Sequence, residues 1–186
     1  DWMVLIGVFC VMVGLLFKVG AAPFHAWTPD VYTGAPTPVT GFMAAAVKIA
    51  AFAAMIRFYT VAAAYLQWDF VYVFAAVAVL TILVGTFAGL VQDDVKRMLA
   101  YSSISHVGFI LMGILAIQKG GTGHVLFYTL GYGLATVGAF GVVTLVRGRD
   151  AEGNVLGEAT SLRKWAGIGR TNPWLAGAML IFLLSF

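Results

Sequence analysis

The sequence predicts an all-α fold, a polytopic transmembrane helix bundle of about six spans. Of the 186 residues, 61% are hydrophobic and 10% are charged, whereas about 25% are charged in soluble domains. The apolar residues gather in long runs, separated by short joints that contain charges, glycine or proline. A run of about 20 residues can cross a hydrocarbon core about 30 Å thick. We therefore expect a single transmembrane domain over residues 1–186.

The expected spans follow the apolar runs in order. They cover residues 2–19 with a continuation over 23–32, then 39–66, 70–91, 94–117, 123–146, and a last run that begins at Pro173. Gly85 and Gly89 are spaced as GxxxG, a pattern that lets two membrane helices approach closely. The chain starts at Asp1 directly before an apolar run, and its last run is short. We therefore expect a piece of a longer subunit, truncated at both ends.

The first span is expected to break between Lys18 and Pro23. Gly20 loosens the backbone, and Pro23 removes an amide donor and clashes with the preceding turn. Broken helices at membrane depth persist only where protein or water satisfies the freed backbone groups. His25 follows the break closely, and we expect it to cap or brace the broken segment. The break predicts a buried ion or proton path.

Lys18 and Lys48 are the strongest candidates for that path. Lys18 lies sixteen residues into its span and Lys48 about nine residues into the next, too deep for either to reach the interface easily. A charge near the bilayer centre costs at least about 2.5–3.5 kcal/mol, and burial disfavours the charged form of a lysine. Such a group can load or release a proton when a nearby field changes. The alternative is a structural lysine that binds carbonyls at the helix break.

His106 lies among small hydroxyl side chains in the span 94–117, and histidine exchanges protons near neutral pH. With Ser102, Ser103 and Ser105 it could line a hydrated seam, or the group could be a polar cluster that joins two helices. Tyr128 and Tyr132 form a polar stripe at i, i+4 spacing on the span 123–146. They could hold water in the same relay, or merely bond across helices.

Several function classes are excluded by what the sequence lacks. A single cysteine, Cys10, rules out internal disulfides and a cysteine-based metal or cluster site. There is no GxGxxG pattern, no P-loop and no histidine pair with metal-ligand spacing. We therefore expect no cofactor site and no metal site in this chain. All eight carboxylates map to joints, none within a span.

The net charge of +3 is interpreted as a topology signal and not as a nucleic-acid signal, because basic residues of membrane proteins gather in cytoplasmic loops. The joints 93–97 and 147–172 hold seven lysines and arginines, whereas Arg57 and Lys119 are the two on the other side. We therefore expect the loops 93–97 and 147–172 to face the cytoplasm.

Two long motifs carry a family resemblance. Residues 17–40 read FKVGAAPFHAWTPDVYTGAPTPVT and residues 96–108 read KRMLAYSSISHVG. Both are similar to the signatures of the antiporter-like subunits of respiratory complex I, the NADH:quinone oxidoreductase. The run GAPTPVT, Lys48 and the ending NPWLAG resemble the N branch of that family. The resemblance covers essentially the whole chain and implies a piece from the C-terminal half of the subunit.

The resemblance implies roles for single residues. Lys18 corresponds to the lysine on the family's broken seventh helix, Lys48 to the eighth-helix lysine and His106 to the tenth-helix histidine. Related subunits have histidine about where Tyr132 lies, a departure that puts the relay at that position in doubt. The family's fifth-helix glutamate and twelfth-helix lysine lie outside this sequence.

The function implied is proton translocation in a membrane arm, moving protons through buried lysines and water without a redox centre. Flavin, iron–sulfur clusters and quinone would belong to other subunits of the complex. The implied partners are other membrane-arm subunits and the lipid bilayer, without nucleic acid, and the implied location is a bacterial inner membrane.

Two other readings are open. The chain could belong to a multi-subunit sodium/proton antiporter, which shares both signatures, and sodium-dependent growth would favour that reading. It could also be a scaffold subunit whose lysines serve packing. Unaltered pumping after both lysines are neutralised would favour the scaffold.

Overall fold

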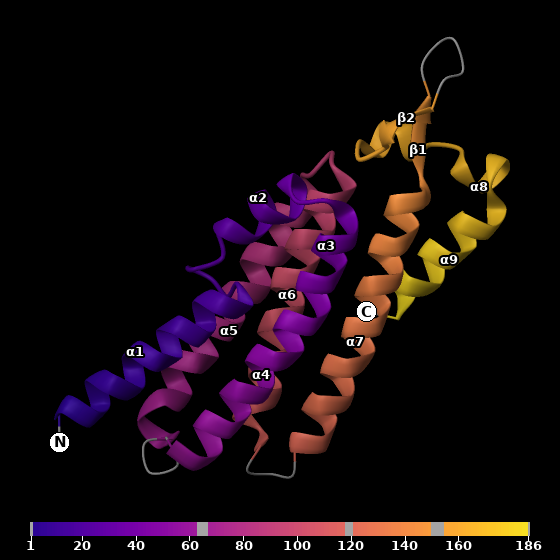
Figure 1. The fold of residues 1–186 in the computed structure, drawn as a ribbon. Helices are drawn as coiled ribbons and strands as arrows, with labels where there is room; N and C mark the ends of the chain where they lie inside the picture. Colours follow the sequence, from indigo (N-terminus) through magenta and orange to yellow (C-terminus); the bar gives the residue numbers. More distant parts are fainter. Residues whose placement is uncertain (1, 63–66, 118–120, 150–154, 186) are drawn as a thin grey trace.

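The protein, described here by a computed structural model, is a bundle of long helices with a small hairpin at one end (Figure 1). The structure describes residues 2–62, 67–117, 121–149 and 155–185. The longer helices are α1 (Trp2–Val19), α2 (Trp27–Gly34), the continuous helical run of α3 (Thr37–Phe42), η1 (Met43–Val47), α4 (Lys48–Arg57) and η2 (Phe58–Ala62), then α5 (Gln67–Leu90), α6 (Val95–Leu115), α7 (Thr122–Leu145) and α9 (Pro173–Leu184).

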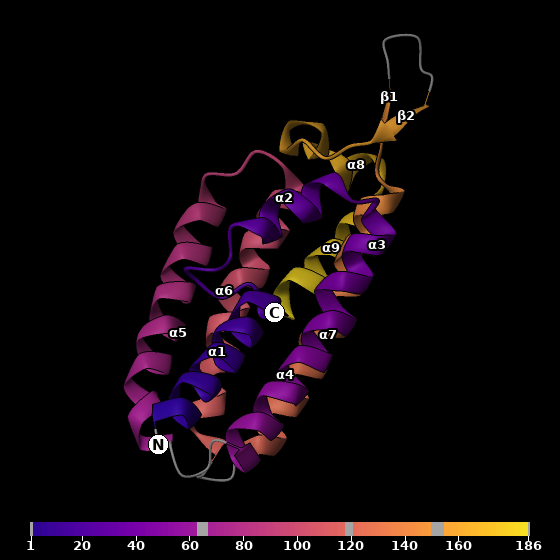
Figure 2. The ribbon, with the colours of Figure 1, turned by 60° about the vertical axis from the view of Figure 1, so that its left-hand side comes forward.

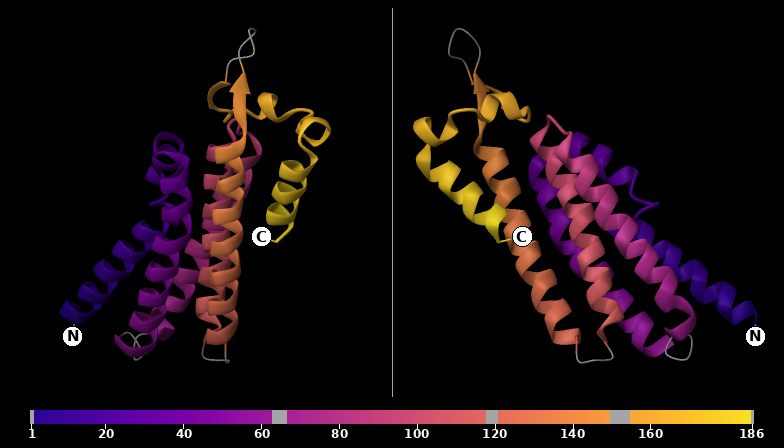
Figure 3. Two further views of the ribbon diagram at one scale, coloured as in Figure 1. Left: turned by 45° about the vertical axis from the view of Figure 1, so that its right-hand side comes forward. Right: turned by 180° about the vertical axis from the view of Figure 1, so that it is seen from behind.

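Five helical segments among the described residues are long and apolar enough to cross a membrane. They are Trp2–Val19, Thr37–Val61, Phe70–Leu90, Val95–Leu115 and Thr122–Leu145. These match the first five predicted spans, although the end of the second, residues 63–66, lies outside the described residues. In place of a sixth long span, the structure has the shorter apolar helix α9, which packs against α7 (Figure 3). The predicted transmembrane helix bundle is confirmed.

The joints that were expected on one side of the membrane gather at one end of the bundle. The turn between α5 and α6, the α2–α3 corner and the segment from β1 to α8 (Ile168–Thr171) lie together, whereas η2 ends and α7 begins at the opposite end (Figures 1 and 2). Lys119, which was counted on the other side, lies outside the described residues. The described residues of the basic loops 93–97 and 147–172 therefore share one end.

The joint after α7 contains a feature that the sequence did not predict. Strand β1 (Arg147–Arg149) pairs antiparallel with β2 (Val155–Glu158), with Arg147 opposite Glu158. The segment that follows docks on the turn before α6, where the amide of Val95 donates to the carbonyl of Thr160 at 2.7 Å. The hairpin was missed because its short strands lack an alternating apolar pattern, which is the usual strand signal.

Helices α5 and α6 are the most closely packed pair, and glycine makes this possible. A Cβ atom on Gly85 would lie 2.4 Å from the backbone nitrogen of Ser105, and one on Gly108 would lie 2.7 Å from the carbonyl oxygen of Ala78. Neither position can hold a side chain without moving a backbone. The close approach predicted from the GxxxG spacing is confirmed at Gly85.

Candidate functional site

Lys48 lies in the interior of the bundle, as predicted. Its side chain is 4% exposed, and its ammonium donates to the carbonyl oxygen of Ser103 on α6 at 3.1 Å and also to the Ser103 hydroxyl. The residue follows directly after η1, a single π-helical turn at Met43–Val47. Such turns insert one residue into a helix and frequently mark functional sites. Neither of the two ion pairs between described residues involves Lys48.

His106 meets both candidate tyrosines. Its Nδ1 atom lies 2.6 Å from the Tyr128 hydroxyl on α7, within hydrogen-bond distance. Its ring also stacks on that of Tyr132, with centroids 4.9 Å apart and an interplanar angle of 27°. Lys48 bonds Ser103, which lies one helical turn before His106 on α6. Side chains from α4, α6 and α7 thus form one polar group inside an apolar bundle.

The serines around His106 divide between two faces of α6. Ser103 is fully buried and faces Lys48, whereas the Ser105 hydroxyl lies 3.1 Å from that of Thr86 on α5. Ser102 and Ser105 line a cavity of about 350 Å³ that also touches His106. The sequence suggested one hydrated seam, but the serines lie on two surfaces of α6: Ser103 faces α4, and Ser102 and Ser105 line the cavity beside α5. Neighbouring residues in a helix point about 100° apart, which separates Ser102 from Ser103.

The helix break occurs where it was predicted. Helix α1 ends at Val19, Gly20 has φ +79°, and helical structure resumes at Trp27. Two freed backbone groups find side-chain partners. The amide of Ala22 donates to the Thr81 hydroxyl of α5 at 3.0 Å, and the indole nitrogen of Trp27 donates to the carbonyl of Phe17 at 3.0 Å.

His25 was expected to cap or brace the broken segment, and this role stays a prediction that its Nδ1 nitrogen does not by itself support. This nitrogen is buried, and no described residue bonds to it. The Thr81 hydroxyl accepts from the freed amide of Ala22, and the Trp27 indole donates to the freed carbonyl of Phe17. Buried polar atoms without a protein partner are where ordered water is expected. The Thr28 hydroxyl beside Gly20 is in the same situation.

Lys18 is placed differently from the prediction. Its side chain is exposed on the surface of the described part of the chain, so the prediction that both lysines are buried holds for Lys48 alone. Lys18 lies in the last turn of α1, on a side that no described helix covers, where neighbouring side chains such as Phe17 are also exposed. A cation in this turn interacts favourably with the C-terminal carbonyls of the helix.

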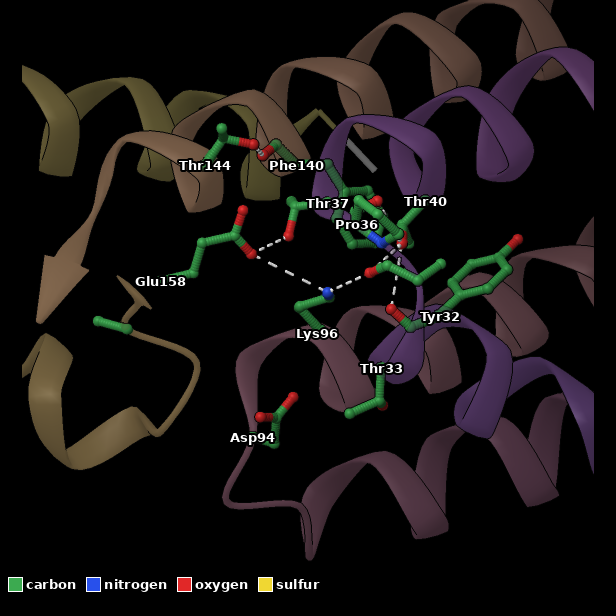
Figure 4. A network of polar contacts seen from close by, with 12 residues as sticks. Tyr32, Thr33, Pro36, Thr37, Thr40, Asp94, Lys96, Phe140, Thr144 and Glu158 are labelled. Atoms are coloured by element: carbon green, nitrogen blue, oxygen red, sulfur yellow. Dashed lines mark hydrogen bonds and ion pairs between the residues drawn. The ribbon is translucent and has the colours of Figure 1, made fainter. Parts of the chain in front are cut away.

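A second buried lysine, Lys96, was treated in the sequence as a topology signal and missed as a core residue. It is 3% exposed, and its ammonium donates to the carbonyl of Ala35 at 2.7 Å, with Glu158 4.0 Å away (Figure 4). The available signal was its position seven residues before Ser103, which puts both residues on one face of α6.

The whole chain, residues 1–186, matches the family described as NADH:quinone oxidoreductase/Mrp antiporter, TM. The chain belongs to this family. It is 55% identical over its full length to NADH-quinone oxidoreductase subunit N of Beutenbergia cavernae, covering 35% of that protein. It is 57% identical, again over its full length, to subunit N 3 of Streptomyces griseus, covering 32% of that protein. The chain thus spans about one third of the length of these relatives.

Solved structures of the family share the fold. Respiratory complex I from Thermus thermophilus contains a chain that is 38% identical, with a TM-score of 0.75 over 95% of this chain and 36% of that one. A chain of the Mrp complex from Dietzia sp. matches with a TM-score of 0.81 over 98% of this chain and 33% of that one, but at 23% identity. The second likeness concerns the fold alone. Sequence identity favours the complex I branch of the family over the Mrp branch.

Proposed function

We propose that this chain is part of a proton-translocating membrane-arm subunit of an NADH-quinone oxidoreductase. The observation that carries the proposal is Lys48, a lysine enclosed by an apolar bundle, whose described partner is the neutral residue Ser103. The burial of an ammonium without a carboxylate partner is costly, so an intramembrane lysine of this kind is a candidate functional residue. The names of the curated relatives support the same assignment.

In the proposed relay, the proton of Lys48 passes toward Ser103 and the aromatic group around His106. A serine hydroxyl can accept one hydrogen bond while it donates another, and histidine can do the same through its two nitrogens. Tyr132 and Tyr128 complete the group, at the ring contact of 4.9 Å and the hydrogen bond of 2.6 Å to His106. Water in the remaining gaps would connect these side chains.

Lys18 is proposed as a second relay point, beside the break at Gly20, Pro23 and His25. Its exposed position in this part of the chain is compatible with a carboxylate supplied from outside these residues. An opposite charge within about 4–6 Å favours the charged lysine, and separating the two favours proton release. Lys18 would then pass its proton toward Lys48.

The chain is further proposed to bind no redox group. No cluster of three metal-ligating side chains occurs in the parts of the chain that the structure describes. Flavin, iron–sulfur clusters and quinone would belong to other subunits, and the partners would be other membrane-arm subunits and lipid. The location would be a bacterial inner membrane, with loops 93–97 and 147–172 in the cytoplasm.

Replacing Lys48 tests the proposal. We expect Lys48→Ala in the assembled complex to lower NADH-driven proton uptake by inside-out vesicles at least about tenfold. A tenfold lower rate corresponds to an activation free energy that is higher by roughly 1.4 kcal/mol. Lys164→Ala is the control, because Lys164 is an exposed lysine of the basic loop. Wild-type uptake by Lys48→Ala, with normal assembly, would instead indicate a scaffold. Sodium that collapses a pH gradient without NADH oxidation would indicate the antiporter.

A further inference from the structure

Lys96 and Glu158 meet at the corner where α2 ends and α3 begins (Figure 4). The corner contains Pro36 and Pro38, which have no amide hydrogen, so its carbonyls need donors from elsewhere. Lys96 supplies one to Ala35 at 2.7 Å, and the Thr40 hydroxyl supplies one to Tyr32 at 3.1 Å. Lys96 thus completes the hydrogen bonding of a turn whose own backbone amides cannot satisfy its carbonyls.

The two charges also match the two helix ends. The Lys96 ammonium lies at the C-terminal end of α2, and Glu158 accepts a hydrogen bond from the hydroxyl of Thr37, the first residue of α3. A cation is stabilised at a helix C-terminus and an anion at a helix N-terminus. Each charge of the pair is therefore placed where the local backbone dipole favours it. An exchange of the two charges would oppose both ends.

The corner holds Tyr32 in the interior of the bundle. Tyr32 is 1% exposed, and its ring meets that of Phe140 on α7 edge to face at 6.2 Å. Ser103, the partner of Lys48, lies seven residues after Lys96 on the same helix, α6. Contacts thus run from Glu158 in the hairpin to Lys96 and the corner that holds Tyr32, and helix α6 connects Lys96 to Ser103.

We infer that Lys96 and Glu158 are positioning residues for the Lys48 relay. The pair fixes the α2–α3 corner, and with it Tyr32, so that Ser103 stays in place to bond Lys48. It also links the hairpin β1–β2 at the basic end to the interior of the bundle. This inference rests on the proposed proton-translocating function and assigns two residues to it that do not carry the proton.

The test measures turnover and proton uptake per assembled complex, with assembly quantified on native gels. We expect Glu158→Gln to lower both at least about fivefold, because misplacements on the order of 1 Å can cost up to roughly 100-fold in rate. Lys96→Gln should lower both by a similar factor, whereas Lys96→Arg, which keeps a cationic donor for Ala35, should keep most of the activity. The double variant Lys96→Gln/Glu158→Gln should lose little more than Glu158→Gln, since residues that act as a unit are not additive.

The charge-exchanged variant Lys96→Glu/Glu158→Lys tests whether each charge must lie at its own helix end or whether any ion pair between the two positions is enough. It restores an ion pair but puts a carboxylate against the Ala35 carbonyl, so we expect it to stay as impaired as Glu158→Gln. Arg97→Gln is the matched control, because Arg97 forms an exposed ion pair with Asp30 of the same α2 helix at 2.8 Å. It should retain wild-type turnover.

The inference is overturned by Glu158→Gln within twofold of wild type, by recovery in the exchanged pair, or by strictly additive losses. If the complex with Glu158→Gln does not assemble, Glu158→Asp is measured in its place, because aspartate keeps the charge and shortens the side chain by one methylene. Wild-type turnover by Glu158→Asp would also overturn the inference. Lys48→Ala distinguishes the two proposals. If it blocks uptake while Glu158→Gln does not, the positioning role is wrong and the relay stands. If it has no effect, the relay itself is wrong.

Discussion

At the scale of single residues, the acceptors of the two buried lysines differ in kind. Lys96 bonds a backbone carbonyl and lies beside a carboxylate. Lys48 bonds a carbonyl and a hydroxyl of the same residue, Ser103. A hydroxyl can rotate and exchange its donor and acceptor roles, whereas a carbonyl cannot. Lys96 is therefore suited to hold structure and Lys48 to exchange a proton.

The Tyr128 hydroxyl can be tested without disturbing its ring. Tyr128→Phe removes the partner of His106 at 2.6 Å and leaves the packing of the aromatic group in place. We expect proton uptake to fall about three- to tenfold, in line with a net hydrogen-bond contribution of about 0.5–1.5 kcal/mol. Tyr72→Phe is the control, because Tyr72 on α5 is 81% exposed. Equal uptake by both variants would show that the His106–Tyr128 contact serves packing only.

At the scale of elements, the break after α1 depends on Gly20. Its φ of +79° is disfavoured for other residues, and a Cβ atom would lie 2.5 Å from the Thr28 hydroxyl oxygen. We expect Gly20→Ala to lower the amount of assembled complex and its melting temperature, at a cost of about 1–2 kcal/mol. Gly14→Ala on the same helix meets no atom within 4 Å and should be neutral. A Gly20→Ala complex that melts with the wild type would contradict the strain argument.

The α5–α6 contact allows a second glycine comparison. Gly85→Ala forces the backbones of α5 and α6 apart, because its Cβ would lie 2.4 Å from the Ser105 nitrogen. We expect a loss of about 1–3 kcal/mol, typical of overpacking, seen as a lower melting temperature. Gly131→Ala on α7 has no atom within 4 Å of its Cβ and is the matched control. Equal melting temperatures would mean that the helices separate at little cost.

Hydropathy and local composition were enough to predict the five long helices and the break, because both depend on near neighbours in the chain. The burial of Lys48 followed from its depth in an apolar run. The exposure of Lys18 could not be predicted in this way, since it depends on which helices cover α1. The burial of Lys96 was missed for the same reason, because its partners lie 61 and 62 residues away in sequence.

At the scale of the whole molecule, the basic joints share one end of the bundle, and this arrangement predicts labelling from one side. We expect a cysteine at Ala166 to react with an impermeant thiol reagent from the cytoplasmic side, and one at Gly123 from the opposite side. Both positions are exposed, and Cys10, also exposed, must first be replaced by serine. Labelling of both from one side would contradict the arrangement, and exchanged sides would reverse the orientation.

The hairpin that closes the α2–α3 corner has a consequence for the order of events during synthesis. Thr37 and its partner Glu158 are 121 residues apart. At about 5–20 residues per second, Glu158 leaves the ribosome roughly 6–24 s after Thr37. During that interval α5, α6 and α7 are made while the corner still lacks its carboxylate. The α2–α3 corner is therefore completed late, and its contact with Glu158 can form only after α7 has been made.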